Sequence, residues 1–452
     1  MHRRDFLALM GASTCFDLAS RLGAQAAPPG PKADLELRIS SVEVEIAPRR
    51  VAKTTGYNGS APGPVLRLPE GKPFTVDVLN DTDTPELVHW HGLFVPAEVD
   101  GAEQEGTPLV PAHGSRRYSF VPRPSGTRWY HSHVYAGRNL KRATYTGQFG
   151  FLYIEPKEDP GQYDAEVFLA LHGWNPYLGV SSPDDDTLDA IYQGFSVNSH
   201  SLGHGDPIRV REGQKVLFRI LNANATMEHR LALPNHKFTV VSLDGNRVPV
   251  PREVETLDLG PAERVDAVVA MNNPGAWILG EVDDKVRNAG LGIVVEYANR
   301  NGEPQWAAPA NLNWDYTIFG RDGNAASTDA QLVPLIFRKK FAGQHWVDKW
   351  TINGKSYPKT DPILVRANTR YRLRFDNQSD ESHPVHLHRH SFELARYRGK
   401  TTSGVIKDVV VVPPQSQVEV DLLADNPGPS LFHCHQQLHM DFGFMTLLQY
   451  TG

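Results

Sequence analysis

The sequence predicts an all-β protein built from three β-sandwich domains. Glycine and proline are plentiful, at 38 and 34 of 452 residues, and both are typical of turns. Strand-like stretches such as FTVDVLN, RLRFDNQ and DVVVVPP recur between those turns. A chain of this length is too long for one ordinary domain and is expected to form about three.

An internal repeat supports the same number of domains. Its three copies span residues 57–80, 197–222 and 352–377. Each copy has an Asn near its start, a turn with Pro, an apolar strand with Arg, and a closing Asn. A repeat of this kind indicates a repeated structural unit.

Two linker-like segments suggest where the domains end. EPKEDPG lies near residue 158, and NGEPQWAAPAN lies near residue 310. The predicted domains therefore cover residues 34–157, 158–310 and 311–452.

The first 26 residues read as an export signal. Arg3 and Arg4 precede a short apolar run, and a small-residue cleavage pattern ends at Ala26. Paired arginines predict export by the twin-arginine machinery to the periplasm or beyond, with an ordinary secretory signal as the alternative. Cys434 would be the one cysteine left in the mature chain, which leaves no partner for an internal disulfide.

Charge and hydropathy exclude some classes of partner. The formal net charge is −6, and no basic stripe indicates nucleic acid. No apolar run after the signal reaches 18 residues, so we expect no membrane span. The oligomeric state is not indicated by any feature of the sequence.

The most informative motif is the triplet His433-Cys434-His435, followed by His439 in HCHQQLH. Successive side chains of a strand point to opposite faces. The two flanking histidines would therefore face one way, and the Cys434 sulfur the other. A thiolate beside imidazoles is the ligand set of a blue-copper electron-transfer centre, and the histidine pair suits a second, all-imidazole copper site.

Three further histidine clusters strengthen this interpretation. They are HWHG with His89 and His91, WYHSH with His131 and His133, and HPVHLH with His383, His386 and His388. In the last cluster His386 and His388 share a strand face, whereas His383 has the opposite parity and can reach the same site as Cys434.

The four motifs, in this order, resemble those of the multicopper oxidases, a family that includes laccases and bacterial metal oxidases. The resemblance covers nearly the whole mature chain. It implies three cupredoxin-like Greek-key domains and four copper ions, with a trinuclear cluster between the first and third domains. The type 1 copper ligands would be Cys434, His383 and His439. The type 2 ligands would be His89 and His386. The type 3 ligands would be His91, His131, His133, His388, His433 and His435.

The resemblance also implies an activity. Donors would give up one electron at a time at the type 1 copper, and His433 and His435 would carry electrons from Cys434 to the trinuclear cluster. Four electrons would reduce O₂ to water. A copper nitrite reductase and a copper-free structural relative are the competing classes. The first does not need eight histidines for a trinuclear centre, and the second loses the ligands.

Two positions depart from the family pattern. The weak axial ligand position of the type 1 copper falls at Phe444, which cannot coordinate, unless a register shift brings in Met445. The carboxylate that often follows the last ligand histidine is replaced by Met440, and Asp441 beside it has the opposite strand parity. Asp100 in EVDG does match a family acid near the type 2 site, although it could be a turn residue before Gly101.

The donor is the least defined part of the prediction. Only six methionines are present and no Met-rich insert, which argues against a specialised Cu(I) oxidase. Asp380 and Glu381 could bind Fe(II) or Mn(II) as substrates. Arg389, Arg396 and Arg398 could instead attract anionic or phenolic donors. We favour a laccase-like oxidase of phenols and similar small molecules, with a metal-ion oxidase as the alternative.

Overall fold

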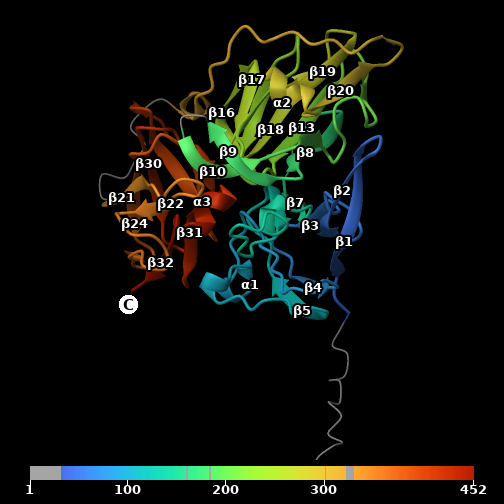
Figure 1. Cartoon of the computed structure of the whole chain (residues 1–452). Helices are drawn as coiled ribbons and strands as arrows, with labels where there is room; N and C mark the ends of the chain where they lie inside the picture. Colours follow the sequence, from blue (N-terminus) through green and yellow to red (C-terminus); the bar gives the residue numbers. More distant parts are fainter. Residues whose placement is uncertain (1–31, 159–160, 183–184, 301, 322–329, 452) are drawn as a thin grey trace, which may run out of the picture.

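A computed structural model gives the fold of most of the chain. It describes residues 32–158, 161–182, 185–300, 302–321 and 330–451. Figure 1 shows three bodies of β-structure that follow one another along the chain, from blue through green and yellow to red. The predicted all-β fold with three β-sandwich units is confirmed. The export signal predicted for residues 1–26 lies outside the described residues.

The N-terminal unit pairs a four-stranded sheet with a three-stranded sheet. The strand orders are β2-β1-β4-β5 and β3-β7-β6. Apolar side chains between them, Trp90 and Tyr130 among them, form one buried core. The strands are β1 (Leu35–Ala47), β2 (Arg50–Tyr57), β3 (Leu66–Pro69), β4 (Phe74–Asn80), β5 (Gly114–Phe120), β6 (Gly126–His131) and β7 (Phe149–Glu155).

The middle unit has a six-stranded sheet, a five-stranded sheet and a separate hairpin. The sheet orders are β11-β8-β13-β18-β15-β16 and β12-β20-β19-β14-β17. The hairpin β9–β10 reaches toward the C-terminal unit (Figure 1), where the Leu188 amide donates to the Trp346 carbonyl. The strands are β8 (Ala165–Trp174), β9 (Tyr177–Ser182), β10 (Asp185–Ile191), β11 (Gly194–Val197), β12 (Ile208–Val210), β13 (Lys215–Asn222), β14 (His229–Ala232), β15 (Phe238–Leu243), β16 (Asn246–Val254), β17 (Thr256–Leu259), β18 (Arg264–Ala270), β19 (Ala276–Glu281) and β20 (Gly292–Tyr297).

The C-terminal unit also packs two sheets face to face. One runs β22-β21-β24-β30-β26-β27, with β28 beside β26, and the other runs β23-β32-β31-β25-β29. The strands are β21 (Gln331–Lys340), β22 (Lys349–Ile352), β23 (Ile363–Val365), β24 (Arg370–Asn377), β25 (His383–Leu387), β26 (Phe392–Tyr397), β27 (Lys400–Thr401), β28 (Ile406–Lys407), β29 (Val409–Val412), β30 (Ser416–Leu423), β31 (Ser430–Cys434) and β32 (Met445–Tyr450).

Helices are short and lie between strands. Within the described residues, none is long and apolar enough to cross a membrane. They are α1 (Ala97–Asp100), α2 (Asp284–Asn288), α3 (Gln437–Asp441) and the 3-10 turns η1 (Glu103–Glu105), η2 (Ala143–Tyr145) and η3 (Tyr316–Phe319). Because Met440 and Asp441 belong to α3, the strand parity that the sequence suggested for them was wrong.

The opening Asn of each sequence repeat makes the same contacts in all three units. Asn58, Asn198 and Asn353 each adopt a positive φ close to +50°, which an Asn tolerates better than most residues. The side-chain oxygen of each accepts a backbone N–H, and its amide donates to a carbonyl two residues earlier on the neighbouring strand. The repeat thus ties the turn before each domain core to the first strand of that unit.

The closing Asn of each repeat is also structurally equivalent. Asn80, Asn222 and Asn377 end β4, β13 and β24, and all three are buried. Their amides donate to carbonyls of the following loop and of a strand or loop further along. These strands run parallel to the first strand of their units, β1, β8 and β21. Each repeat therefore covers the crossover that brings the chain back beside the first strand of its unit. The boundaries near residues 158 and 310 stay a prediction.

Candidate metal centres

Cys434 lies in a buried cluster with His383 and His439. Its Sγ atom is 3.7 Å from His383 Nδ1 and 3.6 Å from His439 Nδ1. The two Nδ1 atoms are 3.2 Å apart. The residues come from β31, β25 and α3, so two adjacent strands and a short helix build the cluster. Burial raises the pKa of the Cys434 thiol and lowers that of His383, which favours uncharged forms until a cation is bound.

Aromatic side chains enclose this cluster. The Phe444 ring lies 4.7 Å from the His383 ring, and the Trp350 ring lies 4.1 Å from the His439 ring. Phe444 is fully buried. Met445, the alternative axial residue, pairs with His433 across β31 and β32 and packs among Leu431 and Met440 instead. Phenyl and indole rings are not copper ligands, so a buried aromatic shell of this kind would keep the site weakly coordinated.

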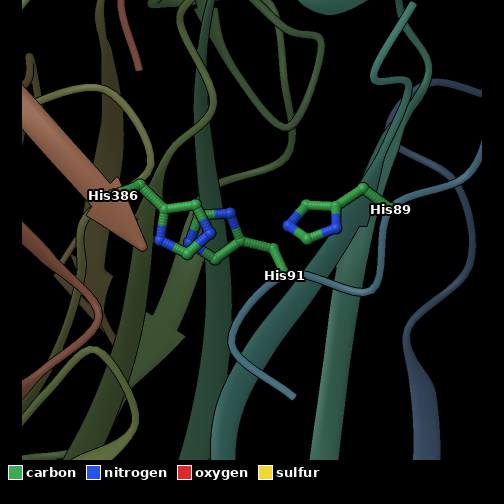
Figure 2. Close-up of side chains that lie close together, drawn as sticks. All are labelled: His89, His91 and His386. Carbon is green, nitrogen blue, oxygen red and sulfur yellow. The ribbon is translucent and has the colours of Figure 1, made fainter. Parts of the chain in front are cut away.

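The eight remaining histidines converge in three buried clusters. Within each, one potential ligand atom from every residue lies within 4.8 Å of the others. Figure 2 shows His89 pointing toward His91 and His386, whose rings stack at 3.8 Å. The clusters are His89, His91 and His386; His91, His131 and His435; and His133, His388 and His433.

Strand register explains why distant motifs meet. His386 lies opposite His433, and Val385 lies opposite Cys434, in the β25–β31 ladder. His89 forms an isolated bridge with His131 at the end of β6. Residues 89–133 and residues 386–435 therefore face each other, and each of the three histidine clusters takes side chains from both segments.

The imidazoles are held as neutral ligands with one nitrogen directed at the clusters. Burial lowers the pKa of His91, His131, His133, His386, His433 and His435 well below the usual value. It lowers the pKa of His388 to about 4. In five histidines Nδ1 is bound to an oxygen: His89 to Asp100 O, His131 to Ser132 O, His386 to Asp408 O, His433 to Cys434 O, and His388 to Asp100 Oδ2.

The free nitrogens fit bound metal ions. The Nε2 atoms of His89 and His386 and both ring nitrogens of His435 are buried without a hydrogen-bond partner among the described residues. Buried polar atoms are rarely left unpaired. A histidine that ligates a metal usually has its other nitrogen hydrogen-bonded, as Nδ1 is in His89 and His386. Three clusters of imidazole nitrogens and one cluster of two imidazoles with a thiol sulfur are therefore ligand sets that suit copper.

Asp100 is a buried neighbour of two cluster histidines. Its Oδ2 lies 2.8 Å from His388 Nδ1 and 3.2 Å from His89 Nδ1. Burial opposes its ionisation, yet its contacts with His89 and His388 hold the pKa of Asp100 well below the usual range. The turn at Gly101 is also real. A Cβ there would lie 2.1 Å from the Val88 carbonyl, so glycine allows the Asp100 loop to press against His89.

Glu105 is a site residue that the sequence did not reveal. It is buried, with Oε1 3.3 Å from His388 Nδ1, and it accepts a hydrogen bond from the Leu431 amide. Burial and the nearby Asp100 raise its pKa well above the usual value. The surrounding EQEG segment has no pattern that distinguishes Glu105 from a surface acid.

The residues proposed around the donor differ in accessibility. Glu381 Oε2 lies 3.1 Å from His439 Nε2, and its side chain is 36% exposed. Asp380 is 72% exposed and 3.8 Å from Lys339. Arg389 is buried and donates to three backbone carbonyls. The suggestion that Arg389 attracts donors was wrong, because its guanidinium is used within the protein.

Comparison with known proteins agrees with this geometry. Models described as multicopper oxidase match residues 38–159, 181–291 and 334–451. The multicopper oxidase MmcO of Mycobacterium tuberculosis is 31% identical over 440 residues, which cover 88% of this chain and 84% of that protein. The chain belongs to the multicopper oxidase family. It is accordingly a copper-dependent oxidoreductase that uses O₂.

Two more relatives extend the comparison. Laccase-2 of Fomitopsis schrenkii is 27% identical to this multicopper oxidase over 462 residues, covering 86% of this chain and 84% of that protein. The crystal structure of a multicopper oxidase from Pseudomonas thermotolerans superposes with a TM-score of 0.73 at 25% identity, covering 93% of this chain and all of that one. The three sandwich units are thus cupredoxin-like.

Proposed function

We propose that this multicopper oxidase is laccase-like and couples one-electron oxidation of phenolic or similar donors to reduction of O₂ to water. Four donor molecules each lose one electron and one proton, and O₂ takes up four of each to give two waters. Copper would supply the redox chemistry. The chain would supply the copper ligands, a route for electrons and acidic groups near the clusters. The similarity to Laccase-2 of Fomitopsis schrenkii supports the donor class.

The proposal assigns four copper ions to the four clusters. Cys434, His383 and His439 would hold the type 1 ion, with Phe444 at the non-coordinating axial position. His89 and His386 would hold the type 2 ion. One type 3 ion would lie between His91, His131 and His435, and the other between His133, His388 and His433. His433 and His435 flank Cys434, so a few covalent bonds would connect the sites.

The contact between Glu381 and His439 is the observation that favours a phenolic donor. His439 is almost fully buried, and Glu381 is the partly exposed group bonded to its outer nitrogen. Burial opposes ionisation of Glu381, but His439 and Lys339 lower its pKa to about 2. Glu381 is therefore a carboxylate at any working pH. It can accept the O–H of a phenol next to the residue through which an electron would leave the donor.

A metal-ion oxidase is the second candidate, because carboxyl groups gather at this place. Asp189 of β10 and Asp380 accompany Glu381 near His439. Lys339 weakens the case, since its ammonium group lies 3.0 Å from Glu381 and 3.5 Å from Asp348. The Lys339 ammonium group would repel a divalent cation, whereas it would not repel a neutral phenol.

The variant Glu381→Gln tests the donor class. We expect its kcat/KM for 2,6-dimethoxyphenol to fall by roughly tenfold, the value of one hydrogen bond to a charged group. Oxidation of ferrocyanide, which needs no proton acceptor, should change little or increase. A change in the type 1 potential would affect both donors, so their ratio isolates the hydrogen bond. Asp380→Asn is the matched control, with an exposed carboxylate next in sequence. A loss confined to Fe(II) oxidation would favour the metal-ion oxidase.

Copper content tests the wider proposal. About four copper ions per chain, with oxygen uptake on a phenolic donor, are expected. No bound copper would indicate the copper-free relative, and fewer ions with nitrite turnover would indicate a nitrite reductase.

We also propose that residues 1–26 direct the protein through the twin-arginine machinery to the periplasm or the exterior. Support comes from Arg3 and Arg4 before an apolar run and the small residues up to Ala26.

A further inference from the structure

One residue from the C-terminal unit holds two cluster histidines, which the copper assignment gives to different ions. Asp408, between β28 and β29, lies with Oδ1 3.2 Å from His91 Nε2. Its backbone carbonyl accepts a hydrogen bond from His386 Nδ1 at 2.7 Å. The Asp408 side chain is completely buried.

His91 is oriented differently from its neighbours. Five cluster histidines bind an oxygen through Nδ1, as described above, whereas His91 binds Asp408 through Nε2. Its Nδ1 instead faces the cluster, 3.4 Å from His131 Nε2. A carboxylate that accepts from Nε2–H fixes the tautomer in which the Nδ1 lone pair is available to a metal.

The Asp408 carboxylate is itself held by arginines from the other two units. Arg264, at the start of β18 in the middle unit, donates to Oδ1 at 2.7 Å and to Oδ2 at 2.6 Å. Arg128 of β6 in the N-terminal unit donates to Oδ2 at 3.2 Å. A two-pronged guanidinium contact sets the plane of a carboxylate as well as its position.

Asp244, a carboxylate of the middle unit, holds the backbone of Asp408 and of the residue that follows it. Asp244 Oδ2 accepts from the amides of Asp408 and Val409 at 3.3 and 3.1 Å and from Lys407 Nζ at 2.9 Å. Lys407 also lies 3.0 Å from Glu263. Three cations and three acidic groups thus share one buried network. Buried charges of this kind are tolerated only where every partner is in place, so small displacements are costly.

We propose that Arg264 and Asp244 of the middle unit position His91 and His386 through Asp408. A unit that contributes no residue to the four clusters would then set the geometry of the trinuclear centre. Arg264, Asp244 and Asp408 are positioning residues in this scheme. The inference rests on the copper assignment proposed above and adds a role for the middle unit.

The variants Asp408→Asn and Arg264→Lys test the scheme against the control Asp266→Asn. Like Asp408, Asp266 is a buried carboxylate paired with an arginine, in this case Arg219. Asp266 lies in β18, and among the described residues it contacts no cluster histidine. Copper per chain, the near-ultraviolet band of the type 3 pair and the type 2 resonance are measured after reconstitution. The blue absorption of the type 1 site serves as an internal reference, and the melting temperature of the copper-free protein reports stability.

We expect both variants to bind the trinuclear copper 10–100-fold more weakly, the usual cost of removing the partner of a ligand histidine. Blue absorption should be retained. Asp266→Asn should lower the melting temperature but keep all the copper. Full copper content and unchanged spectra in Asp408→Asn and Arg264→Lys would overturn the inference, as would an equal copper loss in Asp266→Asn.

If Asp408→Asn does not fold, Asp244→Asn provides the same test, because it keeps the carboxylate of Asp408 and weakens the support of its backbone together with the Lys407 ion pair. Selective loss of trinuclear copper in that variant supports the inference, and full retention overturns it. Failure of the wild-type protein to bind about four copper ions would instead overturn the copper assignment.

Discussion

The Oδ2 atom of Asp100 lies 2.8 Å from the Nδ1 atom of His388, although 288 residues separate the two in sequence. The contact joins the last residue of α1 to the residue that follows β25. It fixes the His388 ring with Nε2 toward His433, 3.0 Å away. Asp100 therefore supports a cluster whose histidines belong to both ends of the chain.

Asp100→Asn should slow reoxidation by O₂ without slowing reduction by the donor. The amide keeps the shape but loses the negative charge beside His89 and His388. A cost of roughly 10–100-fold is expected for such a supporting residue. Stopped-flow measurement of the two half-reactions provides the test. Equal slowing of both, or of neither, would mean that Asp100 acts only as a turn residue.

Cys434→Ser should abolish the intense blue absorption and nearly all oxidation of donors. The serine oxygen cannot replace a thiolate in this ligand set. Copper bound by the other clusters should largely remain, because their histidines are unchanged. Absorption spectra and copper analysis of the purified variant check both points. A variant that stays blue would contradict the assignment of Cys434.

Phe444→Met should lower the reduction potential of the type 1 copper. A thioether at the axial position donates electron density and stabilises Cu(II) relative to Cu(I). Phenols that are hard to oxidise should slow the most. Redox titration of the blue band gives the potential. Met445→Leu is the control, since Met445 packs in a separate apolar cluster with Leu431 and Met440. A higher potential in that control would revive the alternative in which Met445 is the axial ligand.

Replacing Arg3 and Arg4 together by Lys should block export of the mature enzyme. The positive charge of the signal is kept, and only the pair that the twin-arginine machinery reads is lost. Cell fractionation should find the unprocessed, folded protein in the cytoplasm. Unchanged mature protein outside the cytoplasm would indicate the general secretory route.

Glu86→Gln should stabilise the copper-free protein more at pH 8 than at pH 5. Burial raises the pKa of Glu86 from 4.5 to about 7, although the contacts with Arg142 and Ser132 act to lower it. The folded protein therefore holds this proton more tightly than the unfolded chain. The stability linked to it is complete below pH 4.5 and is lost as the pH rises to about 7, by about 3 kcal/mol. Gln cannot ionise and avoids that loss.

Melting temperatures of both proteins between pH 5 and 8 test the role of Glu86. The difference between variant and wild type should grow up to about pH 7 and then level off. A difference that does not depend on pH would show that Glu86 titrates normally in the folded protein.

Local features of the chain carried much of the prediction. The repeats were readable because the same Asn contacts recur in three units, so the same residues are needed at nearly the same spacing. Strand alternation likewise separated Cys434 from its flanking histidines before any fold was known. In the structure His386 lies opposite His433, and Val385 lies opposite Cys434. Both features depend on short segments, whose geometry is set by their own backbone.

Other features depend on how distant segments pack, and only the tertiary structure decided them. Glu105 and Asp408 resemble ordinary acids in sequence, yet the fold buries them beside His388 and His91. Met440 and Asp441 belong to a helix, because the chain turns after β31 to bring His439 back to Cys434. The sequence by itself determined which residue types could bind the metal ions and on which side of its strand each of them lies. Packing of the three units decided which carboxylate holds each histidine, because burial and pairing of charge are set by residues far away in the chain.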